Sequence, residues 1–157
     1  MTNADLAAAA ALAAAAVARG QGDAYDHAIL ALAHSANGEL TAADALFDRA
    51  LALDPGNPAT LTSLAIHYRR QGRNRDAVLA CDDAIRAYPD YPDAWLERGS
   101  ILAAGGSSAA ARASFERAAE LAPHSAAAPA GLAALAHYCN LQKRRAKARP
   151  TQNHLNA

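Results

Sequence analysis

The chain has 157 residues, which is enough for one domain with a buried core. Hydrophobic residues make up 52% of it but aromatic residues only 5%, so we expect a core of many small side chains. Two cysteines cannot form a disulfide framework, and no stretch is apolar enough to span a membrane. The formal net charge is zero, but residues 1–142 carry ten basic and fifteen acidic residues, and this mildly acidic body argues against nucleic-acid binding by the repeats.

Residues 1–22 are predicted to form an N-terminal helix. The run from Leu6 to Val17 consists mostly of alanine, the strongest helix former. This run resembles a signal peptide in length, but no Lys or Arg precedes it and Asp5 stands where positive charge is expected. We therefore interpret it as a helix of the folded protein.

From residue 24 onward the sequence repeats itself every 34 residues. The recurring positions are Gly38, Gly72 and Gly106; Pro55, Pro89 and Pro123; Ala43, Ala77 and Ala111; Ala50, Ala84 and Ala118; and Phe47, Cys81 and Phe115. This interval defines three units, residues 24–57, 58–91 and 92–125. Ala9 and Ala16 fall at the small positions one period earlier, so residues 1–22 are predicted to be a degenerate half-repeat.

Each unit is predicted to be a pair of helices joined by a turn. Glycine ends the first helix because the left-handed turn conformation is cheap only for glycine, and proline ends the second because it cannot continue a helix. Asp23, Asn57 and Ser125 stand in register as N-cap residues. The expected first helices are 24–37, 58–71 and 92–105, and the second helices 40–53, 74–87 and 108–121.

Residues 126–142 are predicted to form a C-terminal capping helix and residues 143–157 a disordered, basic, polar tail. The tail begins with five basic residues between Lys143 and Arg149, and no acid lies beyond Glu120. A localisation signal or a nucleic-acid contact is the alternative to a solvated tail, but no aromatic residues are interleaved. Both lysines lie in this tail, which suggests a truncation or a shifted reading frame after about His137.

The period and the small residues on two facing helices resemble the tetratricopeptide repeat (TPR), in its alanine- and arginine-rich bacterial type. The agreeing residues are Leu64, Tyr68, Ala77, Ala84 and Pro89 in the second unit, and Trp95, Gly99, Ala111, Phe115, Ala118 and Pro123 in the third. His27, Leu61 and Arg98 depart from the family pattern. The resemblance implies an all-α fold, an α-solenoid of stacked antiparallel helix pairs with three TPR units and flanking half-repeats.

In this family the first helices line a concave face on which peptides dock. Carried over by position, the resemblance implies a groove formed by Tyr25, Leu32, Thr62, Ile66, Arg69, Arg70, Asp93, Leu96 and Ser100. The two arginines could pair with a carboxylate of a peptide. We favour the alternative that these arginines pair with Asp93 and Glu97 of the adjacent unit, because neighbouring opposite charges usually satisfy one another.

Binding of the C-terminal tails of heat-shock chaperones is disfavoured. Family members that bind these tails clamp the terminal carboxylate with lysine, asparagine and arginine. Here the corresponding positions hold Ala28, Leu32, Ser63, Asp93 and Glu97. None of these side chains is suited to bind a carboxylate, and two of them would repel it.

No catalytic, cofactor or metal site is predicted. His27 and His34 lie two helical turns apart, too far for joint ligation of one metal, and occupy packing positions. Cys81 lies on the track of Phe47 and Phe115 and is expected to be a small core residue. No glycine-rich phosphate loop carries the required lysine, and no nucleophile–base arrangement is apparent.

The sequence therefore predicts a non-catalytic, cytoplasmic interaction module that binds a partner protein or peptide, without cofactor. Nucleic acid and membrane are not expected partners. The alternative is that the chain is the N-terminal TPR segment of a longer bacterial enzyme, sulfotransferase-like or oxygenase-like, whose catalytic part is missing.

Overall fold

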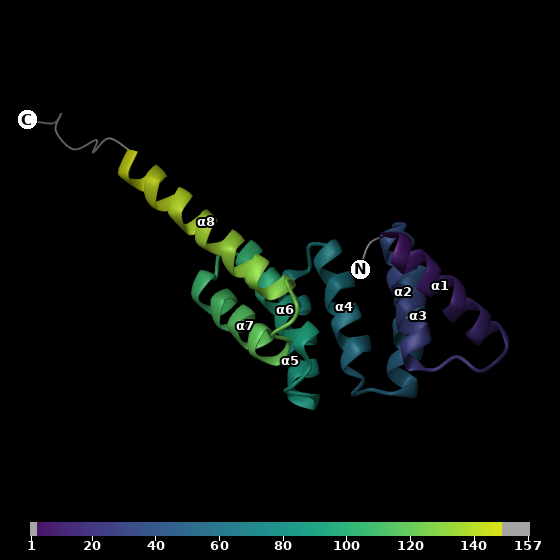
Figure 1. The fold of residues 1–157 in the computed structure, drawn as a ribbon. Helices are drawn as coiled ribbons and strands as arrows, with labels where there is room; N and C mark the ends of the chain where they lie inside the picture. The colour runs from purple at the N-terminus through teal and green to yellow at the C-terminus, as the bar shows by residue number, and fades with distance from the viewer. Residues whose placement is uncertain (1–2, 149–157) are drawn as a thin grey trace, which may run out of the picture.

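Helical hairpins stacked side by side make up the part of the chain that the computed structural model describes, residues 3–148 (Figure 1). These residues contain helices and turns but no strand. The helices are α1 (Asn3–Ala18), α2 (Ala24–Ala36), α3 (Leu40–Leu53), α4 (Pro58–Arg70), α5 (Asn74–Ala87), α6 (Pro92–Ala104), α7 (Ser108–Leu121) and α8 (Ala127–Ala148).

The three repeat units are the hairpins α2/α3, α4/α5 and α6/α7, and each hairpin packs against the next. The prediction of an all-α solenoid of antiparallel helix pairs is confirmed. The first helix of each unit ends one residue before its expected end, and the second helices match the expected bounds. None of the helices in residues 3–148 has the length and apolarity needed to cross a membrane.

The turn inside each hairpin depends on a left-handed glycine. Gly38, Gly72 and Gly106 have φ values of 82°, 75° and 81°, and none of the described non-glycine residues has a positive φ. After each glycine the next backbone N–H turns back to the helix, as when Glu39 donates to the His34 carbonyl at 2.9 Å. An L side chain at these positions would be strained, so the glycine track sets the hairpin geometry.

The starts of the first helices follow the predicted caps. The Asp23 side chain accepts a hydrogen bond from the Asp26 N–H in a full capping box, and Asn57 accepts one from the Thr60 N–H. The Ser125 hydroxyl accepts a hydrogen bond from the N–H of Ala127, the first residue of α8. Polar residues before α2, α4 and α8 thus satisfy helix N–H groups that have no partner inside the helix.

Small side chains fill the core, as the composition suggests. The two alanine tracks are buried, with exposed fractions between 0% and 3%, and Phe47, Cys81 and Phe115 are buried between the helices of their own units and their neighbours. Alanine lets helices approach closely while each one buries little area. Stability therefore comes from repetition of small contacts along the stack.

The two terminal helices differ from expectation. Helix α8 projects beyond the stack and runs to Ala148 (Figure 1), so the prediction that the disordered tail begins at residue 143 was wrong for residues 143–148. Lysine and arginine are good helix formers and are favoured near a helix C-terminus, which accounts for the extension. The rest of the predicted tail, residues 149–157, lies outside the described residues.

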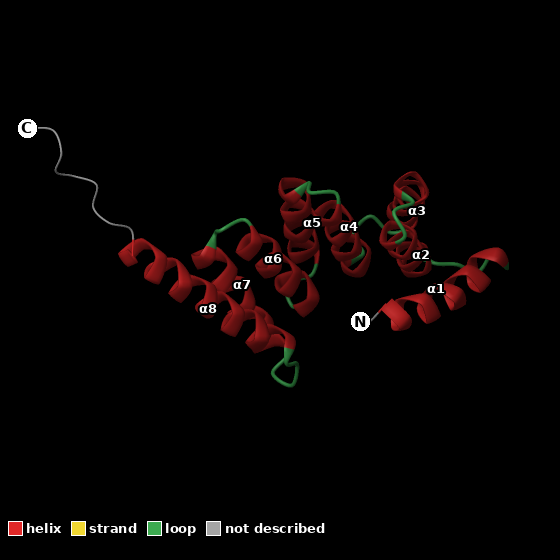
Figure 2. Cartoon of the chain, turned by 90° about the horizontal axis from the view of Figure 1, so that it is seen from above, coloured by secondary structure: helices red, strands yellow, loops and turns green. Residues whose placement is uncertain are grey.

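Helix α1 forms as predicted but does not pack as a regular half-repeat. Its most buried residues are Leu6 and Ala13, whereas Ala9 and Ala16, the predicted small positions, are only half-buried. Figure 2 shows α1 and α3 on opposite sides of α2. Helix α1 therefore lies on the side of α2 that faces the predicted groove.

Candidate functional site

The inner face of the solenoid is formed by the first helices α2, α4 and α6, which lie side by side in this order. The structure brings Ile66, Arg69 and Arg70 of α4 close to α6 and α2. Ile66 is half-buried, as are Leu96 and Ser100 of α6. These residues form the accessible part of the predicted groove, hereafter the α4–α6 groove.

The two arginines of α4 have different partners. The Arg69 Nε donates to the Glu97 carboxylate of the next unit at 2.6 Å, so the favoured interpretation of pairing between adjacent units is confirmed for this residue. The Arg70 Nη1 instead donates to the main-chain carbonyl of Leu32 at 3.4 Å. A guanidinium has five N–H donors, so this contact leaves Arg70, which is exposed, able to bind a carboxylate.

Two of the predicted groove residues are not available to a ligand. Leu32 is 4% exposed because it packs in a cluster with Leu6 and Ala13 of α1. Thr62 is 6% exposed, and its hydroxyl donates to the Pro58 carbonyl at 2.7 Å. The prediction that these two side chains line an open surface was wrong, because the tertiary packing covers them.

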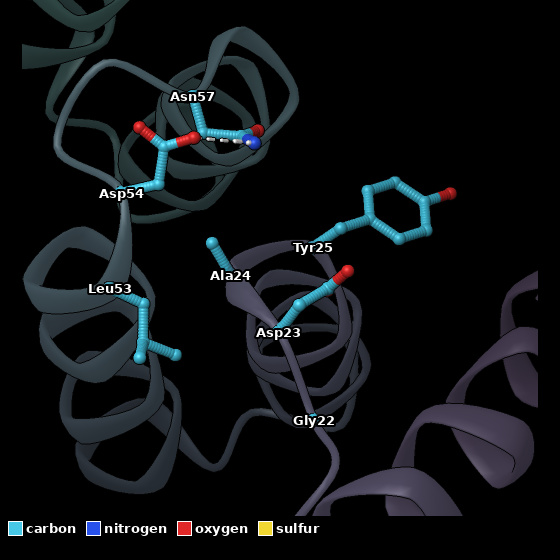
Figure 3. A pocket seen from close by; sticks show the side chains of 7 residues that line it. All are labelled: Gly22, Asp23, Ala24, Tyr25, Leu53, Asp54 and Asn57. Atoms are coloured by element: carbon cyan, nitrogen blue, oxygen red, sulfur yellow. Dashed lines mark hydrogen bonds between the residues drawn. The ribbon is translucent and has the colours of Figure 1, made fainter.

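Tyr25 lies at the edge of the stack, where the loops between units meet. It lines a pocket of about 430 Å³ together with Gly22, Asp23, Ala24, Leu53, Asp54 and Asn57. Figure 3 shows Tyr25 and Leu53 on opposite sides of this pocket, with the Asn57 amide bonded to the Asp54 carboxylate at 3.3 Å. Tyr25 therefore lines the pocket at the loop edge.

The predicted residues of α6 differ in exposure: Asp93 is exposed, whereas Leu96 and Ser100 are half-buried. Asp93 is exposed in the first turn of the helix, near Tyr91. Burial raises the pKa of the Tyr91 phenol, and the negative charge of Asp93 raises this pKa further. Leu96 packs partly against the cluster around Phe115, and the Ser100 hydroxyl donates to the Leu96 carbonyl at 3.0 Å, so this hydroxyl reaches a ligand only as an acceptor.

A polar network around a buried histidine, which the sequence analysis did not identify, joins the first unit to the second. His67 is 0% exposed; its Nδ1 lies 2.7 Å from the Ser35 hydroxyl and its Nε2 lies 2.9 Å from the Asp44 carboxylate. Gln71 also lies 2.6 Å from Nε2. Each nitrogen of the ring therefore has a hydrogen-bond partner. This set is hereafter the His67 network.

The His67 network contains the residue types of a nucleophile–base arrangement, although none was apparent from the sequence. Ser35 is only 5% exposed, so its hydroxyl lies inside the stack and faces no open cleft. A structural role follows, in which three helices are linked through one ring. The signal in the sequence is the repeat position of His67, which is occupied by Ala33 and Ile101 in the other units.

His27, His34 and Cys81 behave as structural residues. His27 is 8% exposed and its Nδ1 contacts the Asp23 carbonyl at 2.7 Å, while His34 pairs with Glu39. Burial, with smaller effects of the Glu97 and Asp82 charges, raises the pKa of the Cys81 thiol to about 12. The core role expected for Cys81 is confirmed. Residues 3–148 hold no group of three or more His, Cys, Asp or Glu side chains placed to bind a metal ion.

Comparison with known proteins places this geometry in a family. Models of the tetratricopeptide repeat match residues 27–59 and 62–126, together more than half of the chain. Cellulose synthase operon protein C of Pseudomonas fluorescens (strain SBW25) is 40% identical over 67 residues, which are 43% of this chain. The chain spans only 5% of the length of that relative.

Two solved structures share the fold at low sequence identity. The TPR domain of Sgt2 from Aspergillus fumigatus is 23% identical with a TM-score of 0.71, and the match covers 85% of this chain and 89% of that domain. The first TPR of Spaghetti (RPAP3), bound to the HSP90 peptide SRMEEVD, is 23% identical with a TM-score of 0.67 and covers 75% and 94%. The chain therefore belongs to the tetratricopeptide-repeat proteins, whose domains are typically protein–protein interaction modules.

Proposed function

We propose that this chain is a non-catalytic module that binds a protein or peptide in the α4–α6 groove. The observation that carries the proposal is the row of half-buried side chains Ile66, Leu96 and Ser100 on one face, with the exposed Arg70 at its rim. Partly buried apolar groups next to a charged fork favour a peptide that combines an apolar side chain with a carboxylate.

The groove is poorly suited to the tail of a chaperone. The RPAP3 domain binds an acidic HSP90 peptide, but here Arg69 is paired with Glu97 and Asp93 adds a second acid to the same face. These acids would repel the terminal carboxylates of such a tail. We expect no measurable anisotropy change when labelled SRMEEVD is titrated with this protein.

The test of the function compares two matched charge reversals in an affinity capture from the source organism. Arg70→Glu changes the groove, and Arg112→Glu makes the same change at an exposed position of the second helix α7. We expect Arg70→Glu to lose at least nine tenths of a partner that the unchanged chain and Arg112→Glu both retain. Equal recovery by all three baits would place the partner away from the groove.

A second proposal is that the chain is the repeat segment of a longer protein. It is supported by the small share, 5%, of the bacterial relative that the chain spans. An enzyme attached to the repeats stays a prediction of the sequence analysis. Sequencing the gene downstream in all frames tests it, and an immediate stop in every frame would contradict it.

A further inference from the structure

Helix α1 covers the α2 end of the predicted groove, next to the α4–α6 groove. Leu6 and Ala13 of α1 are 6% and 3% exposed, and they pack in one cluster with Ile29 and Leu32 of α2. Ile66 of α4 packs against the same cluster. An apolar strip thus runs from beneath α1 into the accessible groove.

The repeat register shows that the surface of α2 beneath α1 lies on the same face as the α4–α6 groove. Leu32 is equivalent to Ile66 and Ser100, one and two periods later, and these residues face the groove. A regular second helix contacts a different position of the next unit: Ala84 of α5 packs with Ala94 of α6. The α2 equivalent of Ala94 is Asp26, which is only half-buried and belongs to the capping box. Helix α1 is therefore displaced from the solenoid position toward the groove.

The attachment of α1 is one-sided. Among the described residues, only α2 comes close to the backbone of α1. One leucine and several alanines make the contact, and alanine buries little apolar area. A short link with a left-handed glycine, Gly20 with a φ of 71°, joins α1 to α2.

We propose that the Ile29–Leu32 surface of α2 is a docking site for a partner's amphipathic helix with one leucine and a face of small residues, and that α1 is its resident occupant. The partner helix binds by displacing α1 and then extends along Ile66 toward Arg70. The chemistry of the ligand is read from α1 itself, whose leucine and alanines fit this surface. The proposal rests on the groove being the binding face.

The probe for this site is a fluorescent peptide of residues 3–18, with two lysines added at its C-terminus for solubility. It is titrated into the unchanged chain and into the full-length variants Leu6→Asp and Leu12→Asp. Leu12 is 75% exposed on the other side of α1, so its variant is a matched control on the same helix. A tethered helix competes at an effective concentration of about 1 mM, so it blocks the peptide while it stays docked.

We expect Leu6→Asp to bind the peptide at least tenfold more tightly than either the unchanged chain or Leu12→Asp. A peptide that itself carries Leu6→Asp should lose this binding, as should the protein double variant Leu6→Asp/Leu32→Asp. Absence of peptide binding to a Leu6→Asp chain whose circular dichroism shows folded helices would overturn the proposal. An α1-swapped dimer of that variant would also overturn it, by assigning the seat to a second copy of the chain.

Hydrogen exchange of the unchanged chain tests the same site without any substitution. Amides of α1 should exchange at least a hundredfold faster than those of α4, because α1 opens separately from the stack. Equal protection of the two helices would make α1 an integral part of the solenoid and contradict the proposal. The peptide and exchange results stand apart from the partner capture, so this site and the proposed function can fail independently.

Discussion

Two junctions hold the three repeat units together, and two of their four equivalent positions are polar in one junction and apolar in the other. The first junction, between the first and second units, is formed by Ser35, Asp44, Phe47 and His67. The His67 ring lies 5.2 Å from the Phe47 ring between centroids and hydrogen-bonds to both polar side chains. This junction is therefore held by directional bonds around one buried ring.

The second junction has apolar residues at three of the same four positions. Arg69, Val78, Cys81 and Ile101 are the repeat equivalents. Ile101 is 2% exposed and packs against Cys81 and the neighbouring alanines, with Val78 partly buried at the same cluster. Arg69 pairs with Glu97 on the exposed side of the junction. Here close packing replaces the hydrogen bonds.

The comparison shows that one backbone arrangement can be held by either kind of contact. The two kinds respond differently to change. Loss of one partner leaves a buried polar group unsatisfied in the first junction, whereas the second loses only packing and burial. The predictions below use this difference.

The largest effect is expected for His67→Ala. The change empties the space beside Phe47 and removes the hydrogen-bond partner of the buried Ser35 hydroxyl. We expect the free energy of unfolding to fall by about 3 kcal/mol, measured by urea denaturation with circular dichroism. Ile101→Ala is the matched change in the second junction and should cost about as much. A loss below about 1 kcal/mol for His67→Ala would mean that water replaces the ring at little cost.

Alkaline pH should weaken the second junction through Cys81. Its folded-state pKa, about 12, lies above the ordinary value of 9.0, so the buried thiol resists ionisation. The contribution of the protonated thiol to the free energy of unfolding is fully present below pH 9. It is lost as the pH rises toward 12, because only the unfolded chain then releases the proton. By pH 10.5 we expect a loss of about 2 kcal/mol that Cys81→Ala does not show. Parallel pH dependences of the two chains would contradict this assignment.

A smaller effect is expected for Arg69→Ala at the second junction. The Arg69 side chain is 41% exposed, so water and salt screen its pair with Glu97, whose side chain is 14% exposed. We expect a loss of about 0.5–1 kcal/mol at low salt that shrinks as salt is added. A salt-independent loss above about 2 kcal/mol would show that the pair acts as a buried one.

Sequence periodicity predicted the hairpins because the residues that begin and end their helices act locally. A glycine that must adopt a left-handed turn, a proline that cannot continue a helix and a capping Asp23 or Asn57 each act within a few residues. The packing of α1 and the C-terminal end of α8 have no such local signal. Alanine marks no face of α1, so its seat on α2 follows from tertiary packing, and the basic end of α8 has the composition of a tail although its residues favour helix.

The groove was predicted only in part for a similar reason. Repeat register gives the face on which a residue lies but not what covers it, so Leu32 was placed on an open surface that α1 buries. The pairing of Arg69 with Glu97 could be expected because it joins the adjacent first helices α4 and α6. The His67 network joins three helices, and only the histidine in an otherwise apolar track hints at it.

The smallest effect is expected when the polar residues of the first junction are replaced by apolar residues like those of the second. The triple variant Ser35→Ala/Asp44→Val/His67→Ile removes the ring together with its Ser35 and Asp44 partners and leaves only the partly exposed Gln71 amide of the network. We expect its unfolding free energy to stay within about 1 kcal/mol of the parent, although His67→Ala alone costs about 3 kcal/mol. Urea denaturation of the parent, the single variant and the triple variant measures the difference. If the triple variant is as unstable as His67→Ala, the hydrogen bonds themselves align the two units, and packing of similar volume cannot replace them.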